Sequence, residues 1–427
     1  MNFQSVCVLG LGYIGLPTAS TFATHGIRVV GVDVNQGIVD GLRGGQIHIY
    51  EPGLRSLVQD ALQSGQLTVS SQVPEADAFV IAVPTPFHED KSADLSYVIS
   101  AAEMVLPSLR RGNLVVLEST SPPLTTLDVV RPILEKSGLV AGEDFHLAYS
   151  PERVLPGQIL RELVENTRII GGVTEASARA GRDLYATFVR GEIILTDATT
   201  AEMVKLMENT YRDVNIAIAN EFSRLADRFG VDVWEAIRLA NRHPRVKILN
   251  PGPGVGGHCI SVDPWFLVQA APDLTPLIHT ARDVNDSQPR FVLQMVQRGL
   301  GNLHGKTIAA LGLAYKPDVD DLRESPAVEV VHLLVNAGAT VHVFEPFKPD
   351  FVISGATSHP SLDEAVAGAD ALLLLVGHQQ LRELDPASVA GLTSARIAMD
   401  CVGGWSPQAW RAAGFTIHRL GVGKDPR

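Results

Sequence analysis

The first two hundred residues alternate short apolar runs with longer segments of helical periodicity. The runs are rich in β-branched residues and lie at 6–9, 28–32, 78–83, 114–117, 145–149, 168–170 and 192–195. Continuous apolar strands between helices are typical of a parallel sheet that is covered on both faces. The pattern therefore predicts a doubly wound α/β domain, a Rossmann domain, over residues 1–197.

The pattern changes at residue 198. Apolar residues recur at helical spacing to about 230, with no Pro or Gly before Gly230, so one long helix is expected. Its apolar stripe belongs either to a core or to a seam between two copies of the chain. Further helix is expected through 240 and again at about 275–299. We expect residues 198–300 to form a central helical domain that carries dimer contacts and a catalytic loop.

A second α/β pattern occupies the last part of the chain. It has a strand and turn at 307–312, a helix at about 327–337, and strands at 341–344, 371–376 and 396–399. We expect a C-terminal Rossmann-like domain over 301–427. No apolar run approaches the roughly 20 residues that a membrane crossing needs, and no signal peptide is expected.

Composition narrows the classes of partner. The 427 residues hold 35 Lys and Arg against 47 Asp and Glu, a net charge of −12, which argues against nucleic acid as a partner. A small anionic ligand remains compatible with this charge, because a few Arg and Lys can reverse the sign inside one cleft. The three cysteines do not form the pattern of a secreted disulfide framework. We expect a location in the cytoplasm.

A glycine-rich turn follows the first strand and opens the first helix. It reads Gly10-Leu11-Gly12-Tyr13-Ile14-Gly15, and Asp33 ends the second strand 18 residues after Gly15. These glycines allow a tight turn, close approach of backbone amides to a pyrophosphate, and helix-to-strand packing. Asp33 would bind the adenine ribose hydroxyls and repel a 2'-phosphate, which favours NAD over NADP. The alternative is a purely structural glycine turn, as we interpret the incomplete pattern at 312–314.

A second glycine-rich segment precedes a cysteine. Four glycines fall within six positions at 252–257, and Cys259 follows the last of them after one residue, His258. Such glycines permit close ligand approach that other residues forbid. From this segment alone, Cys259 is either a nucleophile or an inert structural thiol.

Lys205 and Asn209 lie four residues apart on the predicted long helix and so share one face. The Lys can lower the pKa of a nearby thiol or stabilise an oxyanion, and the Asn amide can donate to the same oxygen. The alternative is a solvated helix face without a catalytic role.

Several segments together resemble the UDP-glucose/GDP-mannose dehydrogenase family over essentially the whole chain. They lie at 10–17, 83–86, 118–120, 149–153, 202–211, 253–263 and 316–325. Within the family, segments 241–245 and 259–266 are most similar to members that oxidise UDP-N-acetyl-D-mannosamine. The resemblance implies oxidation of a sugar C6 alcohol to a carboxylate, which removes four electrons and uses two NAD in turn.

The resemblance also implies roles for individual residues in catalysis. Cys259 attacks the aldehyde to give a thiohemiacetal, which is then oxidised to a thioester. Lys205 and Asn209 stabilise the oxyanion, and Lys205 also takes part in proton transfer. Asp263 or Glu152 activates water for hydrolysis, and Thr120 is expected in catalysis as well as at the cofactor.

The binding residues implied by the resemblance form two sets, and no metal site is expected. For NAD they are Gly10, Gly12, Tyr13, Ile14, Gly15, Asp33, Thr85, Thr120 and Arg323. For the UDP-sugar they are Arg153, Val154, Lys205, Asn209, Arg212, His243, Arg245, Gly256, Tyr315 and Lys316. Arg245 is expected to reach the site of a second copy in a homodimer built on the central helix, although a solvated loop is the alternative for His243 and Arg245.

One position departs from the family pattern. Where relatives carry Arg or Lys after an Asp in the last domain, this chain reads Asp400-Cys401-Val402-Gly403. Val402 cannot contact a diphosphate, so either another cation replaces it or the nucleotide is held more weakly. Rival substrates within the family are UDP-glucose, UDP-N-acetylglucosamine and GDP-mannose. Rivals outside it are a non-catalytic nucleotide-sugar sensor and a two-electron hydroxy-acid dehydrogenase.

Overall fold

The computed structural model describes residues 1–155 and 157–423. It divides into two compact units, unit 1 with Met1–Glu208 and Trp265–Pro272, and unit 2 with Asn209–Pro264 and Asp273–Arg427. Residue 156, inside the expected domain 1–197, and residues 424–427, at the end of the expected domain 301–427, lie outside the described residues. The expected boundaries at 197/198 and 300/301 stay predictions.

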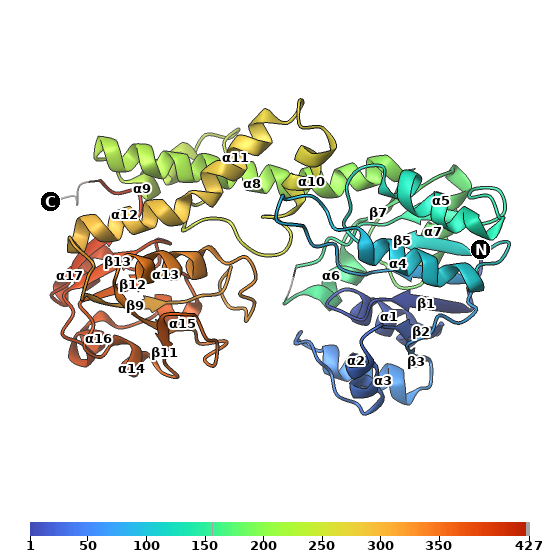
Figure 1. The fold of residues 1–427 in the computed structure, drawn as a ribbon, viewed down its shortest axis with the longest axis horizontal. Coiled ribbons are helices and arrows are strands. Elements are labelled where there is room, and N and C mark those ends of the chain that lie inside the picture. Colours follow the sequence, from blue (N-terminus) through green and yellow to red (C-terminus); the bar gives the residue numbers. More distant parts are fainter. Residues whose placement is uncertain (156, 424–427) are drawn as a thin grey trace. The chain divides into compact units, whose positions relative to one another are not determined.

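Unit 1 is built on one twisted sheet with helices on both faces (Figure 1). Its strands are β1 (Ser5–Leu9), β2 (Arg28–Val32), β3 (Leu67–Ser70), β4 (Ala78–Ile81), β5 (Leu114–Leu117), β6 (His146–Tyr149), β7 (Arg168–Gly172) and β8 (Ile193–Asp197). Its helices are α1 (Gly15–Thr24), α2 (Gln36–Arg43), α3 (Leu54–Gln63), α4 (Ser96–Val105), α5 (Arg131–Leu134), α6 (Ile159–Glu165) and α7 (Glu175–Tyr185). It also contains two short 3-10 helices, η1 (Leu106–Ser108) and η3 (Glu135–Ser137), and one π-helix, η2 (Thr125–Val130).

The strand order is β3-β2-β1-β4-β5-β6-β7-β8, which confirms the doubly wound α/β class. The expectation of a wholly parallel sheet was wrong at one pair, because β6 and β7 run antiparallel. An apolar run of three to five residues carries no signal for strand direction, so the sequence could not reveal this reversal. The reversal brings the start of β7 beside the end of β6, which matters for the site described below.

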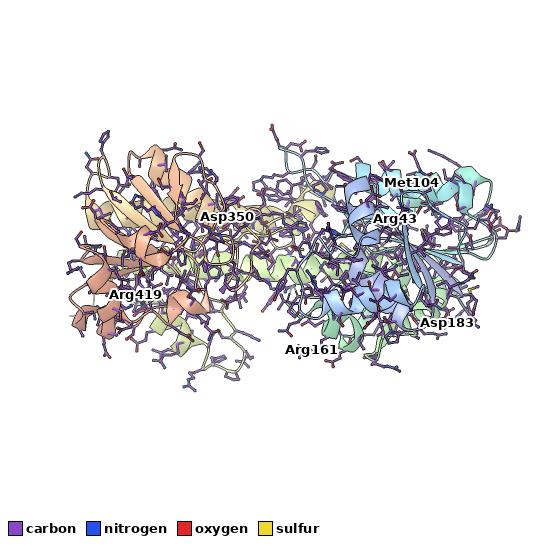
Figure 2. The ribbon with its side chains drawn as sticks, turned by 90° about the horizontal axis from the view of Figure 1, so that it is seen from below. Arg43, Met104, Arg161, Asp183, Asp350 and Arg419 are labelled. Atoms are coloured by element: carbon purple, nitrogen blue, oxygen red, sulfur yellow. The ribbon has the colours of Figure 1, made fainter. Side chains whose placement is uncertain are left out.

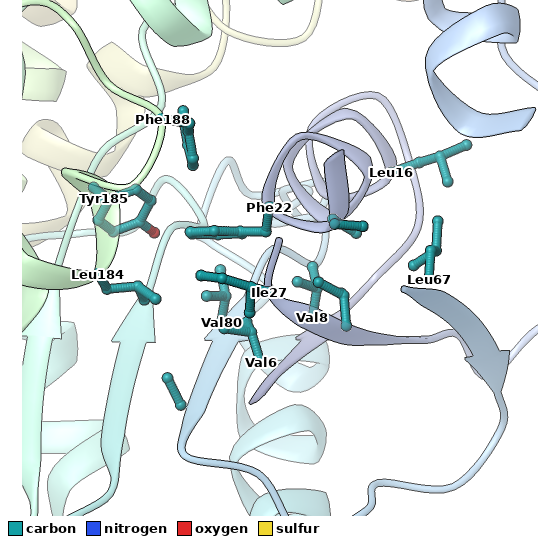
Figure 3. Close-up of a cluster of buried hydrophobic side chains, with 14 of the residues drawn as sticks. Val6, Val8, Leu16, Phe22, Ile27, Leu67, Val80, Leu184, Tyr185 and Phe188 are labelled. Carbon is teal, nitrogen blue, oxygen red and sulfur yellow. The ribbon is translucent and has the colours of Figure 1, made fainter. Parts of the chain in front are cut away.

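Alternate residues of β1 point to opposite faces of the sheet and enter different cores. Val6 and Val8 join α1, α3 and α7 in one cluster, while Cys7 and Leu9 join α4 and α5 in the other. Figure 3 shows the first cluster, where Phe22 packs edge-on against Phe188 with ring centroids 4.8 Å apart. Each such buried ring contributes about 1.5–3 kcal/mol through the hydrophobic effect. The two cores hold β1 in place from both faces, and β1 in turn positions the glycine turn that follows it.

Unit 2 contains a second sheet and most of the remaining helices. The second sheet has the order β11-β10-β9-β12-β13-β14, all parallel, as expected for a Rossmann-like domain. Its strands are β9 (Thr307–Leu311), β10 (Thr340–Phe344), β11 (Ala356–Ser358), β12 (Ala371–Leu374), β13 (Ile397–Asp400) and β14 (Thr416–Arg419). The helices from α9 on are α9 (Val233–Ala240), α10 (Asp263–Ala270), α11 (Pro276–Asp286), α12 (Gln288–Leu300), α13 (Pro326–Asn336), α14 (Leu362–Val366), α15 (Gln379–Arg382), α16 (Pro386–Leu392) and α17 (Pro407–Ala412).

The predicted long helix is confirmed as α8, which runs from Ala198 to Phe229. Gly230 follows it with a φ of +71°, a left-handed conformation that ends a helix at little cost for glycine. Within unit 2, the chain after α8 is tied to the second sheet by an ion pair of 2.9 Å between Asp232, which caps α9, and Arg419 on β14 (labelled in Figure 2). Among the described residues, no helix combines the length and apolar character that a bilayer crossing requires.

Candidate active site

The glycine turn of unit 1 has a separate steric reason for two of its three glycines. Gly10 has a φ of +91°, and a Cβ there would lie 2.7 Å from the carbonyl oxygen of Ala82. A Cβ on Gly15 would lie 1.8 Å from the carbonyl oxygen of Gly10. A Cβ on Gly12 would meet no atom within 4 Å, so the fold itself does not require this glycine. The open space beside Gly12 is what a pyrophosphate on the backbone amides needs.

Two more of the predicted cofactor residues, Asp33 and Thr85, follow the carboxyl ends of the strands on either side of β1. Asp33 follows β2, and its carboxylate accepts from the backbone amides of Leu11 at 3.0 Å and Asn35 at 2.9 Å. Thr85 lies beyond β4, and its hydroxyl is buried without a hydrogen-bond partner among the described residues. The order of β2, β1 and β4 makes this edge the topological switch point, where dinucleotides bind in such sheets. The space at Gly12, the Asp33 carboxylate and the orphaned Thr85 hydroxyl all fit NAD.

We predict opposite outcomes for alanine at two of these glycines. Gly12→Ala should keep the melting temperature within about 2 °C but raise the KM for NAD about tenfold or more, because its methyl group intrudes only on the pyrophosphate. Gly15→Ala should lose both stability and NAD binding, because its methyl group collides with backbone. Calorimetry and NAD titration of both variants check this. Equal melting temperatures for the two would contradict it.

A buried polar cluster lies at the same edge of unit 1, where β5 and β6 end and β7 begins. Arg168 is 5% exposed and forms ion pairs with Glu118 at 3.1 Å and with Glu152 at 2.5 Å. Its guanidinium lies 4.2 Å from the ring centroid of Tyr185, whose hydroxyl donates to Glu118 at 2.6 Å. Only Glu152 of these residues was predicted from the sequence.

Burial raises the pKa of Glu118 to about 7 in spite of the opposing charge of Arg168, and repulsion by Glu152 adds to the rise. The folded chain therefore holds a proton on Glu118 that the unfolded chain releases above its ordinary pKa of 4.5. Its contribution to stability is present below pH 4.5 and is lost as the pH rises through about 7.

We predict that wild type loses stability relative to Glu118→Gln between pH 5 and pH 8, by about 1–3 kcal/mol. The amide keeps an acceptor for Arg168 and Tyr185 but cannot ionise. Urea unfolding of both proteins at the two pH values measures the difference. A difference that is constant with pH, or that grows in favour of wild type, would refute it.

Arg153 and Val154 follow Glu152 in the chain. The guanidinium of Arg153 pairs with Glu208 of α8 and donates to the carbonyl oxygen of Thr167 at 3.0 Å, while Val154 packs partly buried on the first core of unit 1. The structure thus gives Arg153 a carboxylate partner within unit 1, which the sequence analysis did not anticipate.

Lys205 and Asn209 occupy adjacent turns of α8. Lys205 is 8% exposed, and its ammonium makes no hydrogen bond or ion pair with the described residues. A nearly buried cation without a partner is costly and points to an anionic ligand or transition state. Asn209 is 2% exposed and donates from Nδ2 to Asp263, while its Oδ1 accepts from Arg212. The orientation of its amide is thereby fixed.

The segment that carries Cys259 contacts Asn209 within unit 2. The carbonyl oxygen of Cys259 accepts from the amides of Val262 at 3.1 Å and Asp263 at 2.8 Å, at the start of α10. Asp263 links the turn to Asn209. The side chain of Cys259 is exposed, whereas Cys7 and Cys401 are buried. Of the three thiols, Cys259 is therefore the one that a substrate can reach without a rearrangement.

The glycines before Cys259 dock on the loop after β9. A Cβ on Gly256 would lie 2.3 Å from the carbonyl oxygen of Glu324, and one on Gly257 would lie 2.7 Å from the ring of Tyr315. The amide of Gly257 donates to the carbonyl oxygen of Arg323 at 3.2 Å. Only glycine permits these contacts, so the loop over 315–324 fixes the position of the turn.

The charged groups of that loop are also organised. Arg323 binds Asp321 through Nε and Nη2, at 2.9 and 2.6 Å. Burial alone would raise the pKa of Asp321, but the hydrogen bonds and charge of Arg323, with nearby His258, hold it below its ordinary value. Lys316 lies with Nζ 5.8 Å from the ring centroid of Tyr315.

The predicted residues divide between the units. Unit 1 holds the three glycines of the turn with Tyr13, Ile14, Asp33, Thr85, Thr120, Glu152, Arg153, Val154 and Lys205. Unit 2 holds Asn209, Arg212, His243, Arg245, Gly256, Cys259, Asp263, Tyr315, Lys316 and Arg323. Each unit therefore contributes both binding and catalytic candidates.

Three profiles of one protein family match the chain. The NAD binding domain of the UDP-glucose/GDP-mannose dehydrogenase family matches residues 4–189, its central domain matches 199–287, and its UDP binding domain matches 309–407. The chain belongs to this dehydrogenase family. It is an oxidoreductase, a nucleotide-sugar dehydrogenase, and its cofactor is NAD.

Relatives within the dehydrogenase family are similar over nearly their whole length. The NDP-N-acetyl-D-galactosaminuronic acid dehydrogenase of Ralstonia nicotianae is 50% identical and covers 95% of this chain and 97% of its own. The UDP-N-acetyl-D-mannosamine dehydrogenase of Escherichia coli is 47% identical, over 95% of this chain and 100% of its own. The solved UDP-D-ManNAc dehydrogenase of Pyrococcus horikoshii is 42% identical, with a TM-score of 0.91 over 98% of this chain and 99% of that one.

Two features of this dehydrogenase stand outside the contacts described above. His243 and Arg245 lie exposed after α9, and the Arg245 amide donates to His243 Nδ1 at 3.3 Å. Val402 lies in a turn whose amides at 402, 404 and 405 donate to Asp400, and its side chain packs half-buried on apolar neighbours. The Val402 side chain thus serves packing in the UDP binding domain.

Proposed function

We propose that this dehydrogenase oxidises UDP-N-acetyl-D-mannosamine to the corresponding uronate at C6, through a covalent intermediate on Cys259. The observation that carries the mechanism is the exposed Cys259 thiol on a turn of unit 2 that is tied through Asp263 to Asn209. Lys205 of unit 1, which precedes Asn209 on α8 by four residues, adds a nearly buried ammonium that no other described residue pairs. The choice of sugar is supported by the names of the Escherichia coli and Pyrococcus horikoshii relatives.

The residues divide the work between two oxidations and one hydrolysis. Bound NAD supplies the acceptor for each hydride, one equivalent for each oxidation. Lys205 takes part in the proton transfer that accompanies formation of the aldehyde. The Cys259 thiolate then adds to the aldehyde carbon, and Lys205 and Asn209 stabilise the resulting oxyanion. Loss of the second hydride from the same carbon turns this oxygen into the carbonyl of a thioester.

Hydrolysis returns the enzyme to its starting state. Glu152 or Asp263 takes a proton from water, whose oxygen adds to the thioester carbon and expels the Cys259 thiolate as the carboxylate forms. Overall the alcohol and one water become a carboxylate, with two hydrides and three protons released. Thr120 is assigned both to this chemistry and to NAD contact. The UDP moiety is assigned to Arg153, Val154, Arg212, His243, Gly256, Tyr315 and Lys316, and to Arg245.

The name of one relative supports a second sugar, an N-acetyl-D-galactosamine, as the substrate. The relative from Ralstonia nicotianae is 50% identical and is named for an N-acetyl-D-galactosaminuronic acid. A panel of UDP-N-acetylmannosamine, UDP-N-acetylgalactosamine, UDP-N-acetylglucosamine, UDP-glucose and GDP-mannose separates the candidates, with NADH counted per sugar. We expect two NADH per sugar and the highest kcat/KM for the mannosamine. Preference for another sugar would reject the substrate, and one NADH per sugar would reject the mechanism.

We propose a homodimer through α8, because one face of the helix is apolar and exposed. The side chains of this α8 face are exposed by 40% or more and follow helical spacing at Met207, Tyr211, Ile218, Phe222, Leu225 and Phe229. A continuous apolar stripe of this length is typical of a protein interface. In that dimer Arg245 would serve the active site of the second copy. A cytoplasmic location stays a prediction.

The dimer leads to a mutational prediction. Phe222→Glu combined with Leu225→Glu should shift the sedimentation coefficient from dimer to monomer, because two carboxylates cannot be desolvated without partners. The activity of the double variant should also fall, because in a monomer Arg245 cannot reach the active site of a second copy. Tyr50→Glu, at a residue 77% exposed in unit 1, is the matched control and should leave the dimer intact. An unchanged sedimentation coefficient in the double variant would remove α8 as the interface.

A further inference from the structure

The cluster around Arg168 contains one cation and two carboxyl groups, nearly all buried. Arg168 opens β7, Glu118 follows β5 and Glu152 follows β6, so three strands contribute to it. The side chains of Glu118 and Glu152 are 0% and 9% exposed. Arg168 reaches both carboxylates and also donates to the Ser150 hydroxyl at 3.0 Å. The antiparallel pairing of β6 and β7 is what brings the guanidinium beside residues 150–152.

The two carboxyl groups are not equivalent. Glu152 has a donor on each oxygen, Arg168 on Oε2 and the amide of Arg153 on Oε1 at 2.7 Å. Glu118 receives Arg168 and Tyr185 on Oε1, while its Oε2 is buried without a partner in the described chain. The contacts therefore fix Glu152 in one orientation and leave Glu118 partly unsatisfied.

The charges also distinguish Glu118 from Glu152. Burial raises the pKa of Glu118 to about 7, so near neutral pH this group carries much of its proton. Burial also opposes the charge on Arg168, but Glu152 and the other neighbours raise its pKa above the ordinary value. The positive charge of Arg168 therefore acts mainly on Glu152, because Glu118 is partly neutral. The groups that face Glu152 are Arg168, Glu118 and Tyr185, together with the Arg153 amide.

We propose that Arg168 is a positioning residue for the hydrolysis step, which holds the Glu152 carboxylate in the orientation that it needs for the attack of water. This inference rests on the proposed role of Glu152. Arg168 itself is only 5% exposed, so its proposed action is through Glu152 and not through contact with the sugar. Packing alone does not explain the cluster, because buried ion pairs contribute little net stability and apolar replacements are often as stable. An excess carboxyl with an unpartnered oxygen is a further cost that a catalytic use offsets.

The test separates hydrolysis from oxidation in the full-length enzyme with UDP-N-acetylmannosamine, or with whichever sugar of the panel turns over. Rapid-mixing absorbance gives the NADH burst, and intact-protein mass spectrometry gives the fraction of Cys259 held as acyl adduct. For Arg168→Lys we expect an unchanged burst rate, hydrolysis about tenfold slower, and accumulated adduct. The acid limb of the pH profile of hydrolysis should move to higher pH, because one compact ammonium cannot reach Glu152 while it also keeps the contacts with Glu118 and Ser150 that orient the guanidinium. For Arg168→Met we expect about a hundredfold loss.

Glu118→Gln is the matched variant, because it alters the same cluster but keeps the cation that faces Glu152. We expect its acid limb to stay within about 0.3 pH units of wild type, since Glu118 is already protonated there. A cluster with only a structural role would make Arg168→Lys and Glu118→Gln behave alike, and that outcome would overturn the proposal. If Arg168→Met does not fold, Arg168→Lys decides alone.

Glu152→Gln distinguishes this proposal from the proposed function. Adduct accumulation in Glu152→Gln but not in Arg168→Lys rejects the positioning role and keeps the role of Glu152. No accumulation in Glu152→Gln rejects Glu152 as the group that activates water, and the role of Arg168 falls with it. The inference is supported if the adduct accumulates in both variants and if Arg168→Lys shifts the acid limb of hydrolysis in the enzyme that keeps Glu152 but not in the enzyme that also carries Glu152→Gln.

Discussion

Replacing Cys259 with alanine is expected to stop uronate formation, with a loss of at least about 10³-fold in the rate of carboxylate release. Without the thiol the aldehyde has no covalent anchor for its second oxidation, and water attack on a thioester has no substrate. At most one NADH per sugar should form, and the aldehyde should be recoverable with a carbonyl trap. The exposed side chain makes a large effect on folding unexpected.

The matched control for this variant is Cys401→Ala. Cys401 is completely buried, and burial raises its pKa well above the ordinary value, so it is an inert thiol. The Cys401→Ala enzyme should turn over at the wild-type rate and form two NADH per sugar. Uronate production at the wild-type rate by Cys259→Ala would leave the proposed mechanism without its nucleophile.

Lys205→Met is expected to lower kcat about 10²- to 10³-fold while the melting temperature stays level or rises. The methionine keeps the apolar stem of a side chain that is 8% exposed, and it removes an ammonium with no partner in the described structure. Loss of the charge removes stabilisation of the developing oxyanion. It also removes the cost of an unpaired buried cation, which explains why stability and activity should move in opposite directions.

Lys306→Met provides the comparison, because Lys306 is 41% exposed and pairs with Asp370 at 3.6 Å. It should change neither kcat nor stability by a measurable amount. Steady-state kinetics measures kcat and calorimetry measures the melting temperature of both variants, and together these test the prediction. A folded Lys205→Met enzyme with kcat within threefold of wild type would exclude the lysine from catalysis.

The parts of the fold that the sequence predicted are those where one physical signal dominates. The buried strands β1, β4 and β5 are short unbroken apolar runs, and α8 carries a helical stripe with no Gly or Pro until Gly230. The edge strands β3, β11 and β14 were missed, because each has three or four residues and exposes polar side chains on one side. The direction of β7 depends on tertiary pairing and left no trace in local composition.

The candidate site shows the same division. The glycine turn and the Cys259 turn were predicted because backbone geometry allows few other residues there, and the steric contacts of Gly15 and Gly257 bear this out. Arg168 was missed although a signal was present, since a charged residue that opens a buried strand needs a partner. Its partners Glu118 and Tyr185 are 50 and 17 residues away in sequence, so no local pattern joins them.

The division of the chain into units bears on any attempt to exchange its cofactor-binding half. Unit 1 consists of two separate stretches, so the chain passes between the units three times. It does so between Glu208 and Asn209 inside α8, between Pro264 and Trp265 inside α10, and between Pro272 and Asp273 after α10. A fragment that stops at the end of the first β-sheet would omit Lys205 and lack Trp265–Pro272. A chimaera with a relative must therefore graft both stretches and keep the phase of two helices, which is a stricter demand than a cut in a surface loop.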